Sequence, residues 1–389
     1  MIRPRIAKAR LLSLLRQFPV VAILGPRQAG KSTLAKWALP RYYRYDLEDS
    51  GTFTKLAEDP LFFLGRSSRL VIDEVQRLPE LFPVLRGFVD RNPKKKLVLL
   101  GSASPQLVKA ISESLGGRVG VFELGGISIF EEESQRLRIL GGFPRLHWSR
   151  PRAKPIDWYA SYLKTYLEQD IPQLGFRVSH RKLRSLMTMV AHSQGGVCNL
   201  SELGSSLGVN YHSVSHILDI FEGTFLLRRL QPYVVNIGKR LVRNPKLYLR
   251  DTGILHFLLD IPFSRKKLLD HPKAGASFET FCIEQIILHA ELADPAARAF
   301  FYRTHAGAEI DLLLKLRGRL IPIEVKMGLA RPRLRGMRAG MAALGLKKGY
   351  VVNSSEDSSW AARGILACGL RQLIERLRIS PVPFKEASA

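Results

Sequence analysis

Cysteine is scarce in this sequence, and long apolar runs are missing. Its three cysteines, Cys198, Cys282 and Cys368, are widely separated and odd in number. That pattern excludes a disulfide framework and a CxxC metal clamp, and it fits a reducing cytoplasm. No apolar run approaches the roughly 20 residues that a membrane-spanning helix needs. Ser13 and Arg16 interrupt the leucines of the basic N-terminal segment, so we expect an amphipathic helix there rather than a secretory signal.

Acidic residues are also few: 34 Asp and Glu stand against 60 Lys and Arg, a formal net charge of +26. The excess favours a polyanionic partner such as nucleic acid, although a basic solvated surface gives the same number. Much of it lies in Arg228–Arg250 and Arg331–Lys348, and the second stretch contains no acid. With 46% hydrophobic residues and no internal repeat, the chain is predicted to fold into two or three packed domains.

The first 140 residues alternate short apolar runs with longer, helix-like segments. That alternation is typical of an α/β fold in which helices cover both faces of a mostly parallel sheet. The expected strands are Val20–Leu24, Tyr43–Leu47, Leu70–Ile72, Leu97–Leu100 and Val119–Leu124. Residues 149–155 combine prolines with charges and are predicted to be a linker.

A phosphate-binding loop is predicted directly after the first strand. The stretch from Gly25 to Ser32 fits G-x-x-x-x-G-K-[ST] and precedes a helix-like segment, Thr33–Ala38. Backbone N–H groups of such a loop surround phosphate oxygens, Lys31 reaches the β- and γ-phosphates, and the Ser32 hydroxyl can bind Mg²⁺. The expected nucleotide-binding residues are Gly25, Pro26, Arg27, Gln28, Ala29, Gly30, Lys31, Ser32 and Thr33.

Two adjacent carboxylates, Asp73 and Glu74, follow the apolar run Leu70–Ile72. At the C-terminal end of a strand, Asp73 can hold Mg²⁺ through water, and Glu74 can orient a water for attack on the γ-phosphate. The loop and the carboxylates in this order predict nucleotide binding. Hydrolysis is a separate prediction, because binding without turnover needs the same phosphate cradle.

Two further residues are candidates for phosphoryl transfer. Ser102, in the strand end Gly101–Ser104, could sense the γ-phosphate or the attacking water; the alternative is a polar strand-to-loop turn. Arg118 could supply positive charge to the transition state, in its own subunit or in a neighbouring one. The alternative is a solvated arginine.

Residues 197–235 show a helix-turn-helix pattern. Asn199 or Ser201 can cap a short helix, Gly208 can end it, and Asn210 can cap a second one. The inward residues of the second helix would be Val214, Ile217, Leu218 and Phe221, and the outward ones Tyr211, His212, Ser213 and His216.

This outward face could enter a DNA major groove, and nearby basic residues could touch phosphates: Arg228, Arg229, Lys239, Arg240, Arg243 and Lys246. Base-reading side chains are scarce on the second helix, so we expect weakly sequence-specific binding. The alternative is that the segment contacts protein.

Two strands joined by a tight turn are predicted between Glu309 and Lys326. If Arg317 and Gly318 form a two-residue turn, Asp311 lies opposite Glu324 and Glu309 opposite Lys326, all on one face. Opposed carboxylates repel each other, so a divalent cation is a natural reason to tolerate them.

Several of these motifs resemble a known family. The segments concerned are Asp73–Pro79, Gly141–Pro144, Tyr166–Ile171, Asn244–Gly253 and Ile323–Lys326. They are similar to prokaryotic AAA-type ATPases that carry a fused C-terminal domain of unknown function. The resemblance spans almost the whole chain and implies a P-loop ATPase core, a winged-helix segment and a restriction-endonuclease-like α/β module.

The C-terminal carboxylates resemble the D…ExK core of restriction-endonuclease-like, or PD-(D/E)XK, enzymes. That resemblance implies Asp311 and Glu324 as metal ligands, and Glu279, on the apparent helix Ser277–Leu288, as the acid that completes the core. It implies Lys326 as the residue that steadies the attacking hydroxide or the phosphate. The alternative is an ion-pair ladder, including Glu309 with Lys326, that is retained for binding after catalysis is lost.

The expected domains are residues 1–148 (AAA-type P-loop ATPase), 149–235 (linker, helical and winged-helix segment), 236–350 (restriction-endonuclease-like) and 351–389 (strand, helix and tail). The leading hypothesis is a cytoplasmic ATPase that hydrolyses ATP with Mg²⁺ and couples this to DNA binding by its basic C-terminal half. One alternative is an ATP-regulated, metal-dependent nuclease, and another is a non-catalytic switch that binds protein partners. A homo-oligomer stays open, and no membrane partner is expected.

Overall fold

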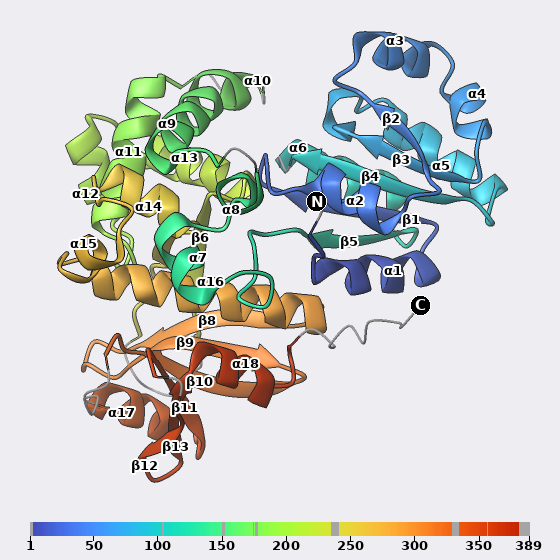
Figure 1. Cartoon of the computed structure of the whole chain (residues 1–389). Helices are drawn as coiled ribbons and strands as arrows, with labels where there is room; N and C mark the ends of the chain where they lie inside the picture. Colours follow the sequence, from blue (N-terminus) through green and yellow to red (C-terminus); the bar gives the residue numbers. More distant parts are fainter. Residues whose placement is uncertain are drawn as a thin grey trace. The chain divides into compact units, whose positions relative to one another are not determined.

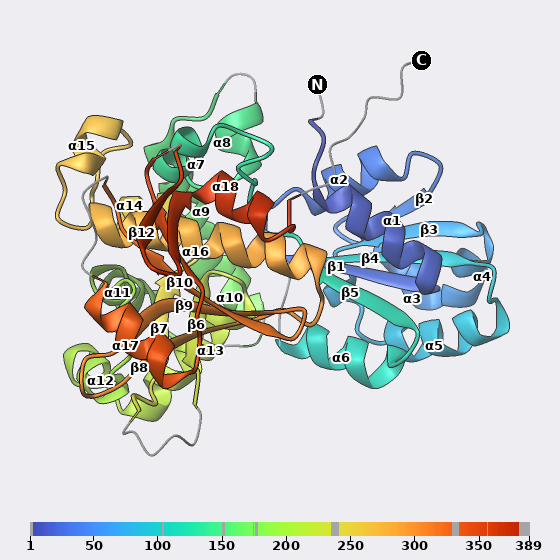
Figure 2. The same cartoon turned by 90° about the horizontal axis from the view of Figure 1, so that it is seen from below.

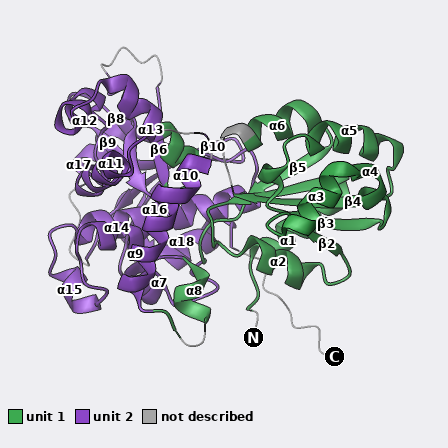
Figure 3. Ribbon diagram, turned by 90° about the horizontal axis from the view of Figure 1, so that it is seen from above, with its two compact units in different colours: residues 1–127, 143–153, 219–226 green, residues 128–142, 154–218, 227–389 purple. Residues whose placement is uncertain are grey.

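The computed structural model describes residues 3–102, 105–149, 152–173, 175, 178–234, 241–328, 334–355 and 357–380. The chain divides into two compact units (Figure 3). Unit 1 comprises residues 1–127, 143–153 and 219–226, and unit 2 comprises residues 128–142, 154–218 and 227–389. Some residues named above lie outside the described part: Ser104, Lys239, Arg240 and Arg331. The four-domain division of the sequence remains a prediction.

The described strands of unit 1 form one parallel sheet in the order β2-β3-β4-β1-β5 (Figure 1). They are β1 (Val20–Gly25), β2 (Tyr43–Asp46), β3 (Arg69–Asp73), β4 (Lys96–Ser102) and β5 (Val119–Glu123). Each of them overlaps a strand expected from the sequence, so the predicted α/β sheet is confirmed. All six residues of β1 are buried, as expected for a strand that is covered on both faces.

Unit 1 also contains helices. They are α1 (Ala7–Gln17), α2 (Lys31–Ala38), α3 (Ser50–Glu58), α4 (Pro60–Gly65), α5 (Leu81–Arg91), α6 (Pro105–Leu115) and α8 (Pro144–Trp148), with a 3₁₀ turn η1 (Val75–Arg77). The predicted amphipathic helix at the N-terminus is α1, which buries Leu11, Leu14 and Leu15. A large core cluster joins Val20, Ala22 and Leu24 of β1 to residues of α3 to α6.

The parallel register brings the C-terminal ends of the central strands to one edge of the sheet. Gly25, at the end of β1, pairs with Ser102, at the end of β4. Strand β3, which ends at Asp73, pairs with β4 on its other side. The loops that follow these strands therefore meet, as ligand-binding loops do in open α/β sheets.

The first half of unit 2 is helical. Its helices are α7 (Ser134–Leu140), α9 (Pro155–Thr165), a π-helical turn η2 (Tyr166–Asp170), α10 (Ile171–Gln173), α11 (His180–His192), α12 (Leu200–Leu207) and α13 (Tyr211–Gly223), which begins in this unit. Asn199 caps α12, Gly208 ends it with φ 65°, and Asn210 accepts a 2.8 Å hydrogen bond from Ser213 N. The predicted helix caps are thus confirmed.

The second half of unit 2 contains a sheet in the order β12-β13-β11-β10-β9-β8-β6-β7. The strands are β6 (Leu227–Pro232), β7 (Lys246–Leu249), β8 (Arg298–Arg303), β9 (Glu309–Leu316), β10 (Arg319–Val325), β11 (Gly349–Asn353), β12 (Ser359–Ala362) and β13 (Ile365–Gly369). A parallel pairing of β6 with β8 joins the antiparallel β6–β7 hairpin to the rest.

Strands β9 and β10 form the predicted tight hairpin. Arg317 and Gly318 have φ values of 48° and 76°, which suit a two-residue type I′ turn. The register runs from Leu316 opposite Arg319 to Leu312 opposite Ile323, as predicted, and the next pair in it is Asp311 with Glu324.

Helices flank this sheet on both faces. They are α14 (Thr252–Leu258), α15 (Arg265–Leu269), α16 (Ala274–Ala293), α17 (Arg335–Ala343) and α18 (Leu370–Arg376). Ile310 packs in one cluster with Met337 and Met341 of α17. Because side chains alternate along a strand, Glu309 and Asp311 point to the face of the sheet opposite to Ile310. Helices α16 and α18 contact each other within the same unit (Figure 2).

None of the helices in the described ranges combines the length and the apolar character that crossing a bilayer requires.

Candidate functional site

The phosphate-binding loop of unit 1 leads directly from β1 into α2. A side chain at Gly25 would meet Leu124 O at 2.3 Å, so only glycine allows β1 to approach the end of β5 this closely. Gly30 has φ 93° and Gln28 φ 63°, and these left-handed conformations turn the chain into the first turn of α2. The backbone N–H groups at this helix start are available to an anion.

Lys31 is folded back onto the loop that precedes it. Its ammonium donates hydrogen bonds of 3.0 Å to Gly25 O and 3.0 Å to Pro26 O. The side chain is buried, and burial lowers the pKa of Lys31, while the charges of Glu74 and Asp73 act in the opposite direction. Lys31 is thus a buried cation that lies close to both carboxylates.

Asp73 and Glu74 stand at the end of β3, beside α2. Burial raises the pKa of Asp73, and a hydrogen bond from the Ser32 side chain partly opposes that rise. The Glu74 backbone adopts a left-handed conformation, with φ 52°. The Gln76 side-chain amide donates to Glu74 Oε2, and Gln76 Oε1 is buried without a hydrogen-bond partner among the described residues. Gln76 therefore holds the Glu74 carboxylate in place.

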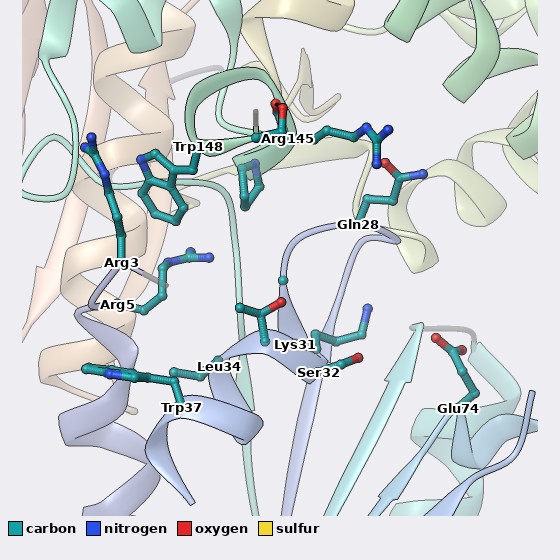
Figure 4. A pocket seen from close by; sticks show the side chains of 14 residues that line it. Arg3, Arg5, Gln28, Lys31, Ser32, Leu34, Trp37, Glu74, Arg145 and Trp148 are labelled. Atoms are coloured by element: carbon teal, nitrogen blue, oxygen red, sulfur yellow. Dashed lines mark hydrogen bonds between the residues drawn. The ribbon is translucent and has the colours of Figure 1, made fainter. Parts of the chain in front are cut away.

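A cavity of about 440 Å³ in unit 1 opens on these residues. Lys31, Ser32 and Glu74 lie toward one end of it, and Arg3, Trp37 and Trp148 toward the other (Figure 4). The side chains of Arg145 and Gln28 lie near each other beside the loop (Figure 4). The cavity thus has one charged end with hydroxyl and carboxylate groups and one end with aromatic rings.

Arg5 supports the phosphate-binding loop through hydrogen bonds to backbone carbonyls, a role that the sequence did not reveal. Its guanidinium donates to Ala29 O (2.9 Å), Gly125 O (3.1 Å) and Gly126 O (3.0 Å), and it is 4% exposed. It also lies 5.8 Å from the centre of the Trp148 ring. On the second tryptophan, Lys8 Nζ lies 4.1 Å from the Trp37 ring centre. Each aromatic ring of the cavity therefore has a cation beside it.

The structure places the two further candidates differently. Ser102 pairs with Gly25 in the β1–β4 register, so its backbone adjoins the loop; a role of its hydroxyl in sensing the γ-phosphate stays a prediction. Arg118 precedes β5, and its carbonyl accepts from Val20 N at the start of β1, the edge of the sheet opposite the loop. Its guanidinium donates to Asp90 at 2.5 and 2.9 Å. The structure does not bring Arg118 to the nucleotide site of its own subunit; a role in a neighbouring subunit stays a prediction.

Two of the predicted phosphate contacts are wrong, because their side chains are buried in ion pairs of unit 2. Arg228 donates to both oxygens of Glu284, at 2.5 and 3.0 Å, and its side chain is 17% exposed. Lys246 is 4% exposed and bonded to Glu309. By contrast, Tyr211, His212 and His216 are exposed on α13, as predicted. The exposed basic side chains include Arg243, Arg335, Arg338, Lys347 and Lys348.

Unit 2 holds an ionic cluster formed by Lys246, Glu279, Glu309, Asp311, Glu324 and Lys326, which we call the carboxylate cluster. Lys326 Nζ lies 2.8 Å from Glu324 Oε1 and 3.7 Å from Asp311 Oδ2. Lys246 Nζ lies 2.8 Å from Glu309 Oε1 and 3.8 Å from Asp311 Oδ1. The structure thus brings together all the predicted residues, but Glu309 pairs with Lys246 rather than with Lys326.

Burial of these carboxylates has a clear electrostatic effect. Desolvation, together with the charge of Asp311, raises the pKa of Glu279 and the pKa of Glu324. Tyr248 donates a 2.6 Å hydrogen bond to Glu279 Oε1, and Asp311 Oδ2 accepts from Val325 N at 3.0 Å. Among the residues that the structure describes, no group of three or more His, Cys, Asp or Glu is arranged to hold a metal ion.

Comparison with known proteins adds to this geometry. Three family models match successive parts of the chain: an AAA domain at residues 17–132, and two domains of unknown function, DUF8612 at residues 131–265 and DUF4143 at residues 274–373. Uncharacterized proteins of Mycobacterium tuberculosis and Mycobacterium bovis are each 40% identical to the chain over 363 residues, which cover 92% of this chain and 81% of theirs. The chain belongs to their family.

Solved structures match more weakly. The Walker-type ATPase of Pyrococcus abyssi has a TM-score of 0.46 at 14% identity, covering 67% of this chain and 96% of that one. AMPPCP-bound DnaA from Aquifex aeolicus has a TM-score of 0.26 at 15% identity, covering 55% and 84%. Both TM-scores lie below 0.5.

Most of the match to the AAA domain lies in unit 1, which holds the loop and carboxylates described above. Sequence reasoning missed Arg5, Arg145 and Trp148, which line the cavity, and Lys246 as part of the carboxylate cluster. The run Gly141–Pro144 marked the region just before Arg145, but no spacing rule connects that region to the phosphate-binding loop. Only the fold brings them together.

Proposed function

We propose that this AAA-domain protein is an ATPase that hydrolyses ATP with Mg²⁺. The observation that carries the proposal is the meeting of Lys31, Ser32 and Glu74 at one end of a single cavity, with Asp73 hydrogen-bonded to Ser32. A hydroxyl and a carboxylate side by side are the hard oxygen ligands that Mg²⁺ prefers, so the residues fit the ion. When bound, Mg²⁺ neutralises charge on the phosphates.

Each side chain then has a defined task. Lys31 exchanges its loop carbonyls for phosphate oxygens, the Ser32 hydroxyl and Asp73 hold Mg²⁺, and Glu74 orients the attacking water. Gln76, which donates to Glu74, positions that carboxylate. Arg145, beside the loop, is the cation that we assign to the γ-phosphate, since Arg118 is engaged with Asp90 on the opposite edge of the sheet.

The aromatic end of the cavity suits the nucleoside. Trp148 and Trp37 offer flat apolar surfaces on which a base can stack, at the end away from Glu74 (Figure 4). We therefore propose that the triphosphate lies along the helix start of α2 and that the base lies between the N-terminal segment and α8.

Phosphate release tests the proposal directly. Wild type should release phosphate from ATP in Mg²⁺, Lys31→Ala should bind ATP more weakly and turn over more slowly, and Glu74→Gln should bind but turn over slowly. Equal rates in all three proteins would contradict it.

We further propose that the C-terminal half binds DNA and that ATP turnover is coupled to this binding. Support comes from the order α11, α12, α13 and the β6–β7 hairpin, which is that of a winged helix, and from the exposed residues of α13. The exposed basic side chains of α17 and the loop after it, such as Arg335 and Lys347, are suited to phosphate contacts.

Fluorescence anisotropy with duplex DNA at several salt concentrations tests this DNA binding. Arg335→Ala with Arg338→Ala should weaken binding and flatten the dependence of affinity on salt, with a slope smaller by about one for each phosphate that the variant no longer neutralises. Lys109→Ala, an exposed lysine of α6, is the control. An affinity that does not change with salt would favour the third hypothesis, a switch that binds protein partners.

A metal-dependent nuclease is the second candidate function. It is favoured by the convergence of Asp311, Glu324 and Lys326 and by the buried Glu324 Oε2, which accepts no hydrogen bond from a described residue. Supercoiled plasmid that stays intact with Mn²⁺ and ATP would count against it. Cleavage that persists in Asp311→Ala would assign the activity to another site.

A further inference from the structure

Lys246 enters the carboxylate cluster from a strand outside the β9–β10 hairpin. It is the first residue of β7, and its side chain is 4% exposed. The ammonium lies 2.8 Å from Glu309 Oε1 and 3.8 Å from Asp311 Oδ1, and 5.5 Å from the ring centre of Phe301 on β8. Two residues further along β7, Tyr248 donates to Glu279 Oε1 at 2.6 Å.

These contacts use the oxygens that a cation would need. A divalent ion in such a site binds carboxylate oxygens at about 2.0 to 2.6 Å. Here Lys246 engages Glu309 and Asp311, Lys326 engages Glu324 and Asp311, and Tyr248 engages Glu279. The cluster therefore differs from the metal site that the resemblance to PD-(D/E)XK enzymes implies.

One carboxylate oxygen of the cluster is left without a partner among the described residues. Glu324 Oε2 is buried and has no hydrogen-bond partner among the described residues. Four carboxylates face two lysines, and Arg303 contacts Glu309 from the rim at 3.6 Å, so the cluster keeps one formal negative charge when all these groups are ionised. The site thus retains an attraction for a cation.

We propose that the Lys246 ammonium occupies the cation position of the carboxylate cluster and keeps a divalent metal ion out of it. A buried ammonium beside Glu309 and Asp311 both repels an incoming ion and blocks its ligands. Lys246 and Tyr248 share one short strand that pairs with β6, so both side chains reach the cluster from β7. The proposal does not depend on the ATPase activity, since all its residues lie in unit 2.

Mn²⁺ binding to the full-length, nucleotide-free protein tests the proposal, with free Mn²⁺ measured by electron paramagnetic resonance. Each protein is paired with its Asp311→Asn version, so that ions bound elsewhere cancel. Wild type should show no Asp311-dependent Mn²⁺. Lys246→Met, which keeps the aliphatic stem and removes the charge, should gain about one Asp311-dependent ion per chain.

Thermal unfolding provides a second measurement. Lys246→Met should melt at a lower temperature than wild type, because it leaves buried carboxylates unpaired, and Mn²⁺ should restore part of that loss. Mn²⁺ should change the melting temperature of wild type no more than that of its Asp311→Asn version. Lys315→Met, an exposed lysine on β9, is the matched control and should match wild type in both measurements.

If Lys246→Met does not fold, a double variant keeps the test decisive. Lys246→Met with Glu309→Gln removes both members of the 2.8 Å pair, so no charge of that pair is left alone. It retains Glu279, Asp311 and Glu324 and should gain the same ion. Asp311-dependent Mn²⁺ in wild type, or no gain in the foldable Lys246 variant, would overturn the proposal.

Discussion

The ammonium of Lys31 donates a 3.0 Å hydrogen bond to the carbonyl oxygen of Gly25, at the start of its own phosphate-binding loop. A second hydrogen bond, to Pro26 O, also holds the Lys31 ammonium against the loop. Phosphate oxygens carry more negative charge than these carbonyls, so a nucleotide should displace them as Lys31 partners.

Lys31→Ala should weaken ATP binding by roughly tenfold to a hundredfold, because a hydrogen bond to a charged group is worth about 1.5–3 kcal/mol. Competition with a fluorescent ATP analogue measures the loss. Lys36→Ala, an exposed lysine of the same helix, is the control and should bind as wild type does. Unchanged affinity for ATP in Lys31→Ala would contradict the assignment of Lys31 to the nucleotide site.

Trp148→Ala should weaken binding of ATP by roughly tenfold, because stacking of a base on an aromatic ring is worth about 1–3 kcal/mol. Inorganic tripolyphosphate, which has no base, should compete equally well in wild type and variant. Trp148→Phe should keep most of the affinity for ATP. Trp360→Ala, a 73% exposed tryptophan of unit 2, is the control.

An equal loss of ATP and tripolyphosphate in Trp148→Ala would show that the ring supports the loop rather than the base. That outcome would still leave the ATPase proposal standing. Failure of wild type to bind either ligand would contradict the nucleotide site itself.

His289 should make unit 2 sensitive to acid. Its Nε2 lies 2.8 Å from Ser128 Oγ, and burial lowers the pKa of His289 from 6.5 to about 4. Between pH 4 and pH 6.5, His289 is therefore protonated in the unfolded chain but not in the folded one. Its contribution to the free energy of unfolding is complete above pH 6.5 and is lost as the pH falls toward 4. The lowered pKa of His256 acts in the same sense.

Raised pKa values at Glu279 and Glu324 act in the opposite sense, so the prediction concerns a difference between proteins. The free energy of unfolding of wild type minus that of His289→Gln should grow by about 2 kcal/mol from pH 5 to pH 7. Urea unfolding at both values measures it. His180→Gln, an exposed histidine, should show no such growth, and a constant difference for His289→Gln would contradict the burial argument.

Local patterns predicted those parts of the fold that depend on neighbours in the chain. The all-apolar run at Val20 to Leu24 fixed a buried parallel strand, and Arg317 with Gly318 fixed the turn and hence the pairing of Asp311 with Glu324. Caps at Asn199 and Asn210 followed in the same way. In each case the residues that determine the strand, turn or helix cap lie within one short segment.

Partners that are distant in the sequence could not be predicted this way. Arg228 was expected to be able to contact DNA phosphates, but its guanidinium is engaged by Glu284 of α16. Lys246 reaches Glu309 only because β7 lies beside β6. Arg5 looked like one more basic residue, yet three backbone carbonyls accept its hydrogen bonds. No periodicity encodes such contacts.

Glu74→Gln provides the most direct test of the central claim, because it separates binding from hydrolysis at one oxygen. The variant should bind ATP with wild-type affinity in Mg²⁺ and release phosphate roughly a hundredfold more slowly, since positioned general bases contribute about 10²–10⁴-fold. Glu80→Gln, an exposed neighbour, is the control and should hydrolyse ATP at the wild-type rate. Measured together, unchanged binding with a collapsed rate supports an ATPase built on Glu74, whereas an unchanged rate of phosphate release would contradict it.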